Sequence, residues 1–135
     1  MEAVAYDFNV RGDERGSLVA IEERRDIPFP IRRIYYIFGT QPGVVRGLHA
    51  HRQLQQVMMC LHGSCQLQLD DGRDQTVVSM KRNDRGVLID RMVWHQMYDF
   101  SPDCVLLVLA DDYYDEDDYI RDYQEFKALA APAGR

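Results

Sequence analysis

Short segments in which apolar residues dominate, or alternate with polar ones, recur at close spacing along this sequence. Residues that favour turns separate them, as in "FGTQPG" and "KRNDRG". Many short strands joined by turns, without a helical pattern between them, predict an all-β fold, an antiparallel barrel or sandwich. The eight predicted strands cover residues 17–22, 31–38, 55–61, 65–70, 75–80, 86–89, 94–100 and 104–110.

One helical pattern stands near the C-terminus, over residues 115–129 ("DEDDYIRDYQEFKAL"). Its first turn is acidic, which suits the positive end of a helix dipole. Four apolar side chains recur there at helical spacing, and we expect them to pack on the sheet. These are Tyr119, Ile120, Tyr123 and Phe126. The pattern predicts a short C-terminal helix on an otherwise all-β domain.

The organisation of the chain is simple. The alternating residues 65–80 flank Asp71-Gly72 and predict a β-hairpin. No repeat or linker interrupts the sequence, so residues 1–135 are expected to form a single domain. Residues 130–135, "AAPAGR", are expected to be a frayed tail.

Composition and charge exclude several classes of protein. Hydrophobic residues make up 46% and charged residues 28%, as in globular proteins. The net charge of −6 argues against nucleic-acid binding, and no apolar run approaches the roughly 18 residues of a membrane span. The N-terminus "MEAVAYDFNV" does not resemble a signal peptide, so we expect a cytoplasmic protein. The cysteines show no CxxC spacing, and we expect buried reduced thiols there.

Two histidines carry the candidate chemistry. His49 and His51 lie in the segment "VVRGLHAHRQLQQ", and in a strand they point to the same face. Imidazoles on the inner face of a barrel need polar partners, because unpaired polar groups are costly there. The pair is therefore open to three interpretations: metal ligands, an acid–base pair, or ordinary polar residues with satisfied partners.

The spacing of glycine and histidine from Gly43 to Gly63 resembles the first motif of the cupins, whose jelly-roll barrel agrees with the strand pattern. Metal-binding cupins have a glutamate where this chain has Gln56, or Gln55 in a shorter register. A neutral amide is a poorer ligand for a divalent cation than a carboxylate. We therefore expect no metal and no cofactor, although His95 leaves a three-histidine metal site as an alternative.

Histidine is suited to proton transfer because its pKa lies near neutrality. The segment "RGLH" is similar to the signature of the cupin sugar-nucleotide epimerases, in which the histidine removes a proton from a carbon beside a ketone. An enzyme like the dTDP-sugar 3,5-epimerases is thus a second alternative. A sugar-nucleotide-binding module without catalysis is a third.

A closer resemblance covers about residues 6–126. Segments such as "RGDERGSLVAIE", "VVRGLHAH" and "YYDEDDYIRDY" resemble the sugar 3,4-ketoisomerases, cupins that act on dTDP-4-keto-6-deoxyglucose in deoxysugar biosynthesis. This resemblance implies a metal-free isomerase that moves the ketone from C4 to C3 through an enediol. It also implies a dTDP-linked keto sugar as the ligand.

The resemblance gives the candidate site residues their roles. His49, the histidine of "RGLH", is expected to remove the C3 proton, and His51 to move protons between the oxygens or to C4. Tyr35 or Tyr36 is expected to donate to the developing oxyanion, and only one of them can face the pocket.

Three further residues are expected to bind the substrate and to determine the configuration of the product. Arg15 and Arg46 are candidates for the diphosphate or the sugar. Arg15 together with His95 resembles the members that form 3-keto-6-deoxygalactose rather than the glucose epimer, with a protonated His95 as a possible proton donor at C4. We also expect a homodimer, because small sandwiches often pair.

One departure from the family pattern concerns the turn before "VWH". Family members commonly have Pro-Gly there, whereas this chain has Arg91 and Met92. We expect the turn to form without its usual rigid residues, and Arg91 to reach the mouth of the pocket.

Overall fold

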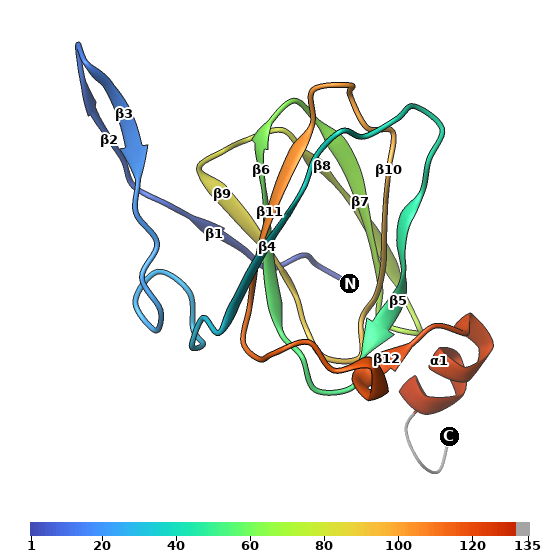
Figure 1. The fold of residues 1–135 in the computed structure, drawn as a ribbon. Helices are drawn as coiled ribbons and strands as arrows, with labels where there is room; N and C mark the ends of the chain where they lie inside the picture. Colours follow the sequence, from blue (N-terminus) through green and yellow to red (C-terminus); the bar gives the residue numbers. More distant parts are fainter. Residues whose placement is uncertain (132–135) are drawn as a thin grey trace.

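The computed structural model describes residues 1–131, and Figure 1 shows their arrangement. The strands are β1 (Ala5–Asp7), β2 (Val10–Asp13), β3 (Gly16–Val19), β4 (Arg33–Ile37), β5 (Arg46–His51), β6 (Gln56–His62), β7 (Cys65–Asp70), β8 (Gln75–Met80), β9 (Arg85–Ile89), β10 (Trp94–Tyr98), β11 (Val105–Ala110) and β12 (Tyr119–Ile120). A 3-10 turn, η1 (Glu116–Asp118), precedes β12, and one helix, α1 (Tyr123–Ala130), follows it.

Two antiparallel sheets form a sandwich, which confirms the predicted all-β fold. One sheet has the strand order β1-β9-β6-β11-β4, and the other has the order β12-β5-β10-β7-β8. Alternate residues point inward, so that the largest core cluster unites residues such as Leu67 and Met97 of one sheet with Leu106 and Val108 of the other. The hairpin predicted over residues 65–80 is confirmed as β7 and β8.

A second hairpin leaves the sandwich. Strands β2 and β3 pair with each other alone, in the register Val10↔Val19 to Asp13↔Gly16. In Figure 1 this ribbon extends away from the two sheets. It carries exposed apolar side chains, among them Leu18. Within the described chain, the strands of this hairpin form no pairing with any other strand.

The single helix predicted over residues 115–129 is wrong in its extent. Asp115 caps η1 by accepting from the backbone N–H of Asp117, and Asp122 caps α1 by accepting from Gln124 and Glu125. Between the two caps, β12 is extended and pairs with β5. Aspartate thus starts two short elements instead of populating one helix, and α1 begins at Tyr123.

Other expectations concern burial and the chain end. The cysteines Cys60, Cys65 and Cys104 are buried free thiols, as predicted, and burial raises the pKa of Cys60 to about 12.

The predicted frayed tail falls mainly on 132–135, outside the described residues, whereas Ala130 still belongs to α1. Within residues 1–131, no helix has the length and apolar character to cross a membrane.

Candidate active site

A cavity of about 340 Å³ opens between the two sheets. Strand β4 of one sheet and strands β5, β10 and β12 of the other provide most of its wall. It is lined by Arg33, Ile34, Tyr35, Ile37, Arg46, Gly47, His49, His95, Met97, Tyr114 and Tyr119. A larger hollow of about 580 Å³ lies along the β2–β3 hairpin, but the residues of that hairpin alone line it, and no histidine is among them. The cavity between the sheets is therefore the candidate active site.

Three histidines meet at this cavity. His49 on β5 and His95 on β10 are partners in the sheet register, and their ring centroids lie 4.5 Å apart. His51, two residues further along β5, lies 4.9 Å from His49 and 6.1 Å from His95. The expected shared face of His49 and His51 is thus observed, and the cross-strand pairing adds His95 to it.

The glycine of "RGLH" is required by the close approach of β5 to β10. Gly47 has a positive φ of 87°, and a Cβ there would lie 2.9 Å from the backbone oxygen of His95. The register shifts between His95 and Gln96 at this point, so that the strands form an irregular pair. The next residue, Leu48, also has a positive φ of 60°. This local backbone turns His49 toward the cavity.

The imidazole of His49 is neutral in this setting. Burial lowers its pKa, although the carbonyl of Gly47 opposes this effect. Its Nδ1 lies 3.0 Å from that carbonyl oxygen, which can only accept, so the proton of the neutral ring is on Nδ1. Nε2 then carries the lone pair that a proton-abstracting group needs.

His95 is fully packed, and its pKa is lowered to about 3 by burial and by the charges of His49 and His51. The expectation of a protonated His95 is therefore not met, because a buried site of this kind keeps the imidazole neutral. Its Nδ1 lies 3.4 Å from the carbonyl oxygen of Val93, the same arrangement as at His49.

His51 lies behind His49, at 3% exposure, and does not line the cavity. Burial and the nearby His49 lower its pKa to about 4, so it is also neutral near pH 7. Its Nδ1 faces a carboxylate, Oδ2 of Asp118, at 3.3 Å. His51 is thus placed to exchange protons with neighbouring groups. His49, which lines the cavity, is the histidine of this strand that a substrate would contact.

The alternation of β4 separates the two tyrosines. Tyr35 points into the cavity, whereas Tyr36 is 62% exposed on the opposite face. The hydroxyl of Tyr35 donates to Oε1 of Gln56, which is completely buried. Burial raises the pKa of Tyr35 to about 12, and this effect outweighs the nearby cations Arg33 and Arg46. Tyr35 therefore keeps its proton at neutral pH. Its single O–H is given to Gln56 here, so donation to a substrate oxygen requires the hydroxyl to rotate about its C–O bond.

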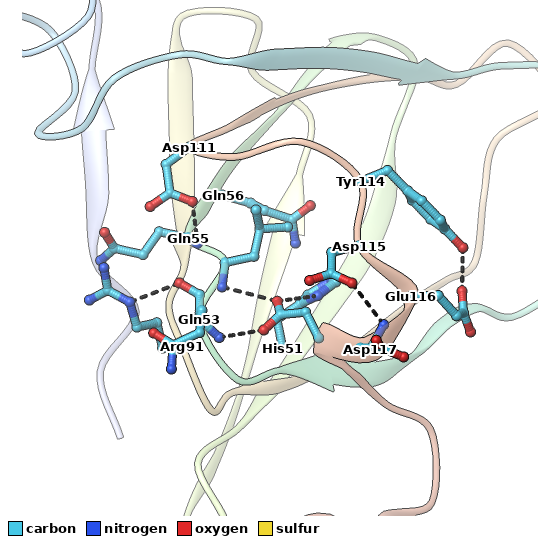
Figure 2. A network of polar contacts seen from close by, with 12 residues as sticks. His51, Gln53, Gln55, Gln56, Arg91, Asp111, Tyr114, Asp115, Glu116 and Asp117 are labelled. Carbon is cyan, nitrogen blue, oxygen red and sulfur yellow. Dashed lines mark hydrogen bonds and ion pairs between the residues drawn. The ribbon is translucent and has the colours of Figure 1, made fainter.

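The predicted arginines are divided by the fold. Arg46 lines the cavity. Arg15 lies at the tip of the β2–β3 hairpin, with its guanidinium paired to Asp13 at 2.7 Å and no contact with the cavity of its own chain. Arg91 lies outside the cavity as well, because its Nε donates to the carbonyl oxygen of Gln53 at 2.8 Å (Figure 2). The turn at Arg91 and Met92, which lacks Pro-Gly, is thus stabilised by this hydrogen bond of the Arg91 side chain.

Several cavity residues escaped the sequence prediction. Arg33 shares the inward face of β4 with Tyr35, so strict alternation was a signal for it; its guanidinium lies 5.0 Å from the Tyr35 ring. Tyr119 was assigned to the helix, but β12 places it 4.4 Å from His51, ring centroid to centroid. Tyr114 lies in the segment before η1 and hydrogen-bonds Glu116 (Figure 2). Only the folded chain end brings these rings to the cavity.

The two glutamines at the place of the glutamate ligand of metal-binding cupins have other contacts. Gln55 donates from Nε2 to Asp90, and Gln56 accepts from Tyr35. Over residues 1–131, no group of three or more histidine, cysteine, aspartate or glutamate side chains is arranged to hold a metal ion.

The antiparallel sandwich and the histidine-lined cavity between its sheets place the chain among the cupin-fold enzymes. The chain belongs more narrowly to the family described as "FdtA: WxcM-like, C-terminal", whose model matches residues 1–131. It is an isomerase of the sugar 3,4-ketoisomerase type.

Known relatives agree over nearly the whole chain. A TDP-4-oxo-6-deoxy-alpha-D-glucose-3,4-oxoisomerase of Aneurinibacillus thermoaerophilus is 51% identical over 97% of this chain and 94% of its own length. A solved 3,4-ketoisomerase from Helicobacter canadensis is 44% identical, with a TM-score of 0.93 over 96% of this chain and 98% of that one. A variant of the 3,4-ketoisomerase QdtA from Thermoanaerobacterium thermosaccharolyticum was solved with TDP-4-keto-6-deoxyglucose. It is 39% identical, with a TM-score of 0.92 over 95% of this chain and 93% of that one.

Two further solved relatives from Campylobacter jejuni differ in the sugar that names them. WlaRA, a TDP-fucose-3,4-ketoisomerase, is 36% identical, with a TM-score of 0.91 over 97% of each chain. WlaRB, a TDP-quinovose 3,4-ketoisomerase, is 42% identical, with a TM-score of 0.90 over 93% of this chain and 97% of that one.

Proposed function

We propose that this protein converts TDP-4-keto-6-deoxyglucose into a TDP-3-keto-6-deoxyhexose. The observation that carries the proposal is the position of His49, which lines the cavity with its Nδ1 3.0 Å from the carbonyl oxygen of Gly47. This contact favours the proton on Nδ1 and leaves the lone pair on Nε2. The relative named as an oxoisomerase of this substrate supports the choice of sugar. No resident metal or cofactor is part of the proposal.

The reaction is a proton transfer in two halves. Nε2 of His49 takes the proton from C3, the electrons of that bond form the C3–C4 double bond, and O4 receives a proton to give an enediol. A proton then adds at C4 while O3 loses its own, which leaves the ketone at C3. The hydroxyl of Tyr35, which remains protonated, is placed to stabilise the oxyanion between the two halves. His51, in edge contact with His49, is proposed to relay the protons of the oxygens.

Cations in the wall suit an anionic substrate. Arg33 and Arg46 both line the cavity, and we assign them to the diphosphate. Nε of Arg33 is buried and lacks a hydrogen-bond partner among the described residues, so it is available for an oxygen atom of the ligand. The rings of Tyr114 and Tyr119 offer flat surfaces beside these cations.

The product is assigned to the galacto configuration. This assignment rests on the resemblance of the Arg15 and His95 pair to the galactose-forming members of the family. His95 lines the cavity as a neutral ring, so it acts through shape and hydrogen bonding at C4 and not as a charged acid. The relatives WlaRA and WlaRB are named for different sugars, so the configuration needs its own measurement.

A homodimer would explain Arg15. Within one chain the hairpin extends away from the sandwich (Figure 1). The side chain of Arg15, at the turn between β2 and β3, is 85% exposed. Strand β4 is an edge strand. The exposed rings of Tyr36 on its outer face and of Phe38 just beyond its end are typical of a surface that pairs with another copy. We propose that the chain forms a homodimer in which the hairpin of one copy brings Arg15 to the cavity of the other.

The test is incubation with TDP-4-keto-6-deoxyglucose in deuterium oxide, followed by proton NMR of the product sugar. We expect deuterium at C4, a 3-ketone and no label at C5. Label at both C3 and C5 would instead identify a 3,5-epimerase. His49→Asn should lower kcat by about 10²–10⁴-fold while TDP binding, measured by calorimetry, stays within about threefold.

The matched control is His62→Asn, because His62 is exposed and lies outside the cavity. This variant should retain wild-type turnover. Full activity of His49→Asn would overturn the assignment of the base.

A further inference from the structure

His51 is the histidine of the site whose Nδ1 faces a charged group. The 3.3 Å contact with Oδ2 of Asp118 is longer than a well-aligned hydrogen bond. Nδ1 is nevertheless completely buried, and no other polar atom within residues 1–131 is placed to satisfy it. At His49 and His95, by comparison, the group that faces Nδ1 is a backbone carbonyl. The carboxylate is thus a specific feature of His51.

Asp118 is held in place from the other side. The backbone N–H of Gln53 donates to its Oδ1 at 2.8 Å, and that of Leu54 donates to its Oδ2 at 3.1 Å. These residues lie in the loop that follows β5, and Figure 2 shows Gln53 beside His51. The side chain of Asp118 is only 12% exposed. The carboxylate is therefore oriented by the loop that leaves the histidine strand.

The chemical consequence concerns the two nitrogens of His51. A neutral imidazole carries a single N–H, and a carboxylate can only accept, so the pair places that proton on Nδ1. Nε2 then remains an acceptor, free to take a proton from a neighbour. When it does so, the carboxylate stabilises the imidazolium more strongly than a carbonyl would, because the hydrogen bond becomes charge-assisted.

We propose that Asp118 is a positioning residue of the isomerase, which holds His51 with its proton on Nδ1 so that Nε2 can relay protons during the keto transfer. The relay role of His51 rests on the proposed function above. Asp118 itself does not line the cavity.

A structural role of Asp118 in fixing the loop is the competing explanation, and the chain offers a matched control for it. Oδ1 of Asp111 accepts from the backbone N–H of Gln55 at 3.0 Å, in the same loop (Figure 2). Within residues 1–131, Asp111 forms no hydrogen bond or ion pair with a histidine. Asp111→Asn therefore weakens a loop anchor, by neutralising the carboxylate that accepts the Gln55 N–H, without touching the relay.

The experiment compares Asp118→Asn, Asp118→Glu and Asp111→Asn with the wild type. Nitrogen-15 NMR of histidine-labelled protein reports which ring nitrogen of His51 carries the proton, and His51→Gln assigns its signals. In the wild type we expect the proton on Nδ1. In Asp118→Asn the new amide NH₂ can donate to Nδ1, so the proton should move to Nε2, and kcat should fall by about 10²–10⁴-fold with KM within about threefold.

Asp118→Glu keeps a carboxylate and should recover at least tenfold over Asp118→Asn, whereas Asp111→Asn should stay within threefold of the wild type. Equal losses in Asp118→Asn and Asp111→Asn would overturn the proposal, since both would then act through the loop. A wild-type His51 with its proton on Nε2 would overturn it without any variant. Absence of isomerisation by the wild type would overturn the proposed function instead, and the NMR result would still decide the His51–Asp118 pairing.

Discussion

The hydroxyl of Tyr35 on β4 donates a 2.5 Å hydrogen bond to Oε1 of Gln56 on β6, across the intervening strand β11. The glutamine that stands where metal-binding cupins have a glutamate thus accepts a hydrogen bond from the candidate oxyanion donor. An amide in this place keeps the tyrosine protonated and oriented without adding a negative charge next to a developing oxyanion.

Removal of the Tyr35 hydroxyl should therefore slow catalysis without unfolding the protein. We expect Tyr35→Phe to lower kcat by about 10²-fold, the usual loss for one oxyanion donor, with little change in the thermal midpoint. Tyr113→Phe is the control, since this tyrosine is exposed and does not line the cavity. Steady-state kinetics on both variants checks this, and equal effects would remove Tyr35 from the site.

Arg15 should act on the cavity of a second copy. Arg15→Ala and His49→Asn are each expected to be nearly inactive alone. After joint refolding in equal amounts, about half of the dimers are mixed and each contains one intact site, so about a quarter of the wild-type activity should return. If Arg15 served its own chain, every mixed site would lack one group, and no activity would return. Light scattering establishes the oligomeric state beforehand.

His95 should control the configuration at C4. Because its neutral ring lines the cavity in contact with His49, His95→Gln changes the surroundings of C4 while the base stays intact. We expect the loss of C3 deuterium or proton to remain within about tenfold, while the product shifts toward the gluco epimer. The coupling constants of H4 in the NMR spectrum report the ratio. An unchanged pattern would show that another group delivers the proton.

The buried histidines should make the fold sensitive to acid. Histidine in the unfolded chain titrates near pH 6.5, whereas burial lowers the pKa of His95 to about 3 in the folded chain. Between these values the unfolded state binds a proton that the folded state does not, so the free energy of unfolding falls as the pH falls, by about 1.4 kcal/mol per pH unit for this proton.

Urea unfolding at pH 6.5, 5.5 and 4.5 tests this relation. His95→Gln should flatten the dependence by about that slope, and the exposed His62→Gln should not. Parallel curves for the wild type and His95→Gln would mean that His95 is not neutral in the folded chain.

Turnover should not depend on a metal ion. Oε1 of Gln56 already accepts from Tyr35, and the proposed steps need only proton carriers. After dialysis against a strong chelator, with metal content measured by mass spectrometry, activity should remain above about 80% of a sample dialysed in buffer alone, since no step of the general acid–base route involves a metal. Loss of activity that added zinc or iron restores would favour the three-histidine alternative.

Much of the fold followed from local patterns. Alternation located the strands, Asp71-Gly72 located a hairpin, and the i, i+2 rule put His49 and His51 on one face. The same rule required one of Tyr35 and Tyr36 to face inward, and would have pointed to Arg33 as a partner of Tyr35. These features depend on neighbours in sequence, which a single chain displays.

Pairing between segments that are distant in the sequence determined the remaining features of the fold and of the site. The acidic run near the C-terminus predicted a helix, yet Tyr119 and Ile120 pair with His51 and Ala50 of β5, and the helix begins only after them. That pairing places Asp118 against His51. The register of β10 on β5 likewise sets His95 opposite His49. The sequence by itself supplied the reactive side chains, whereas the sheet register decided which of them meet, because contacts between remote strands depend on the packing of the whole sandwich and leave no periodic mark in the chain.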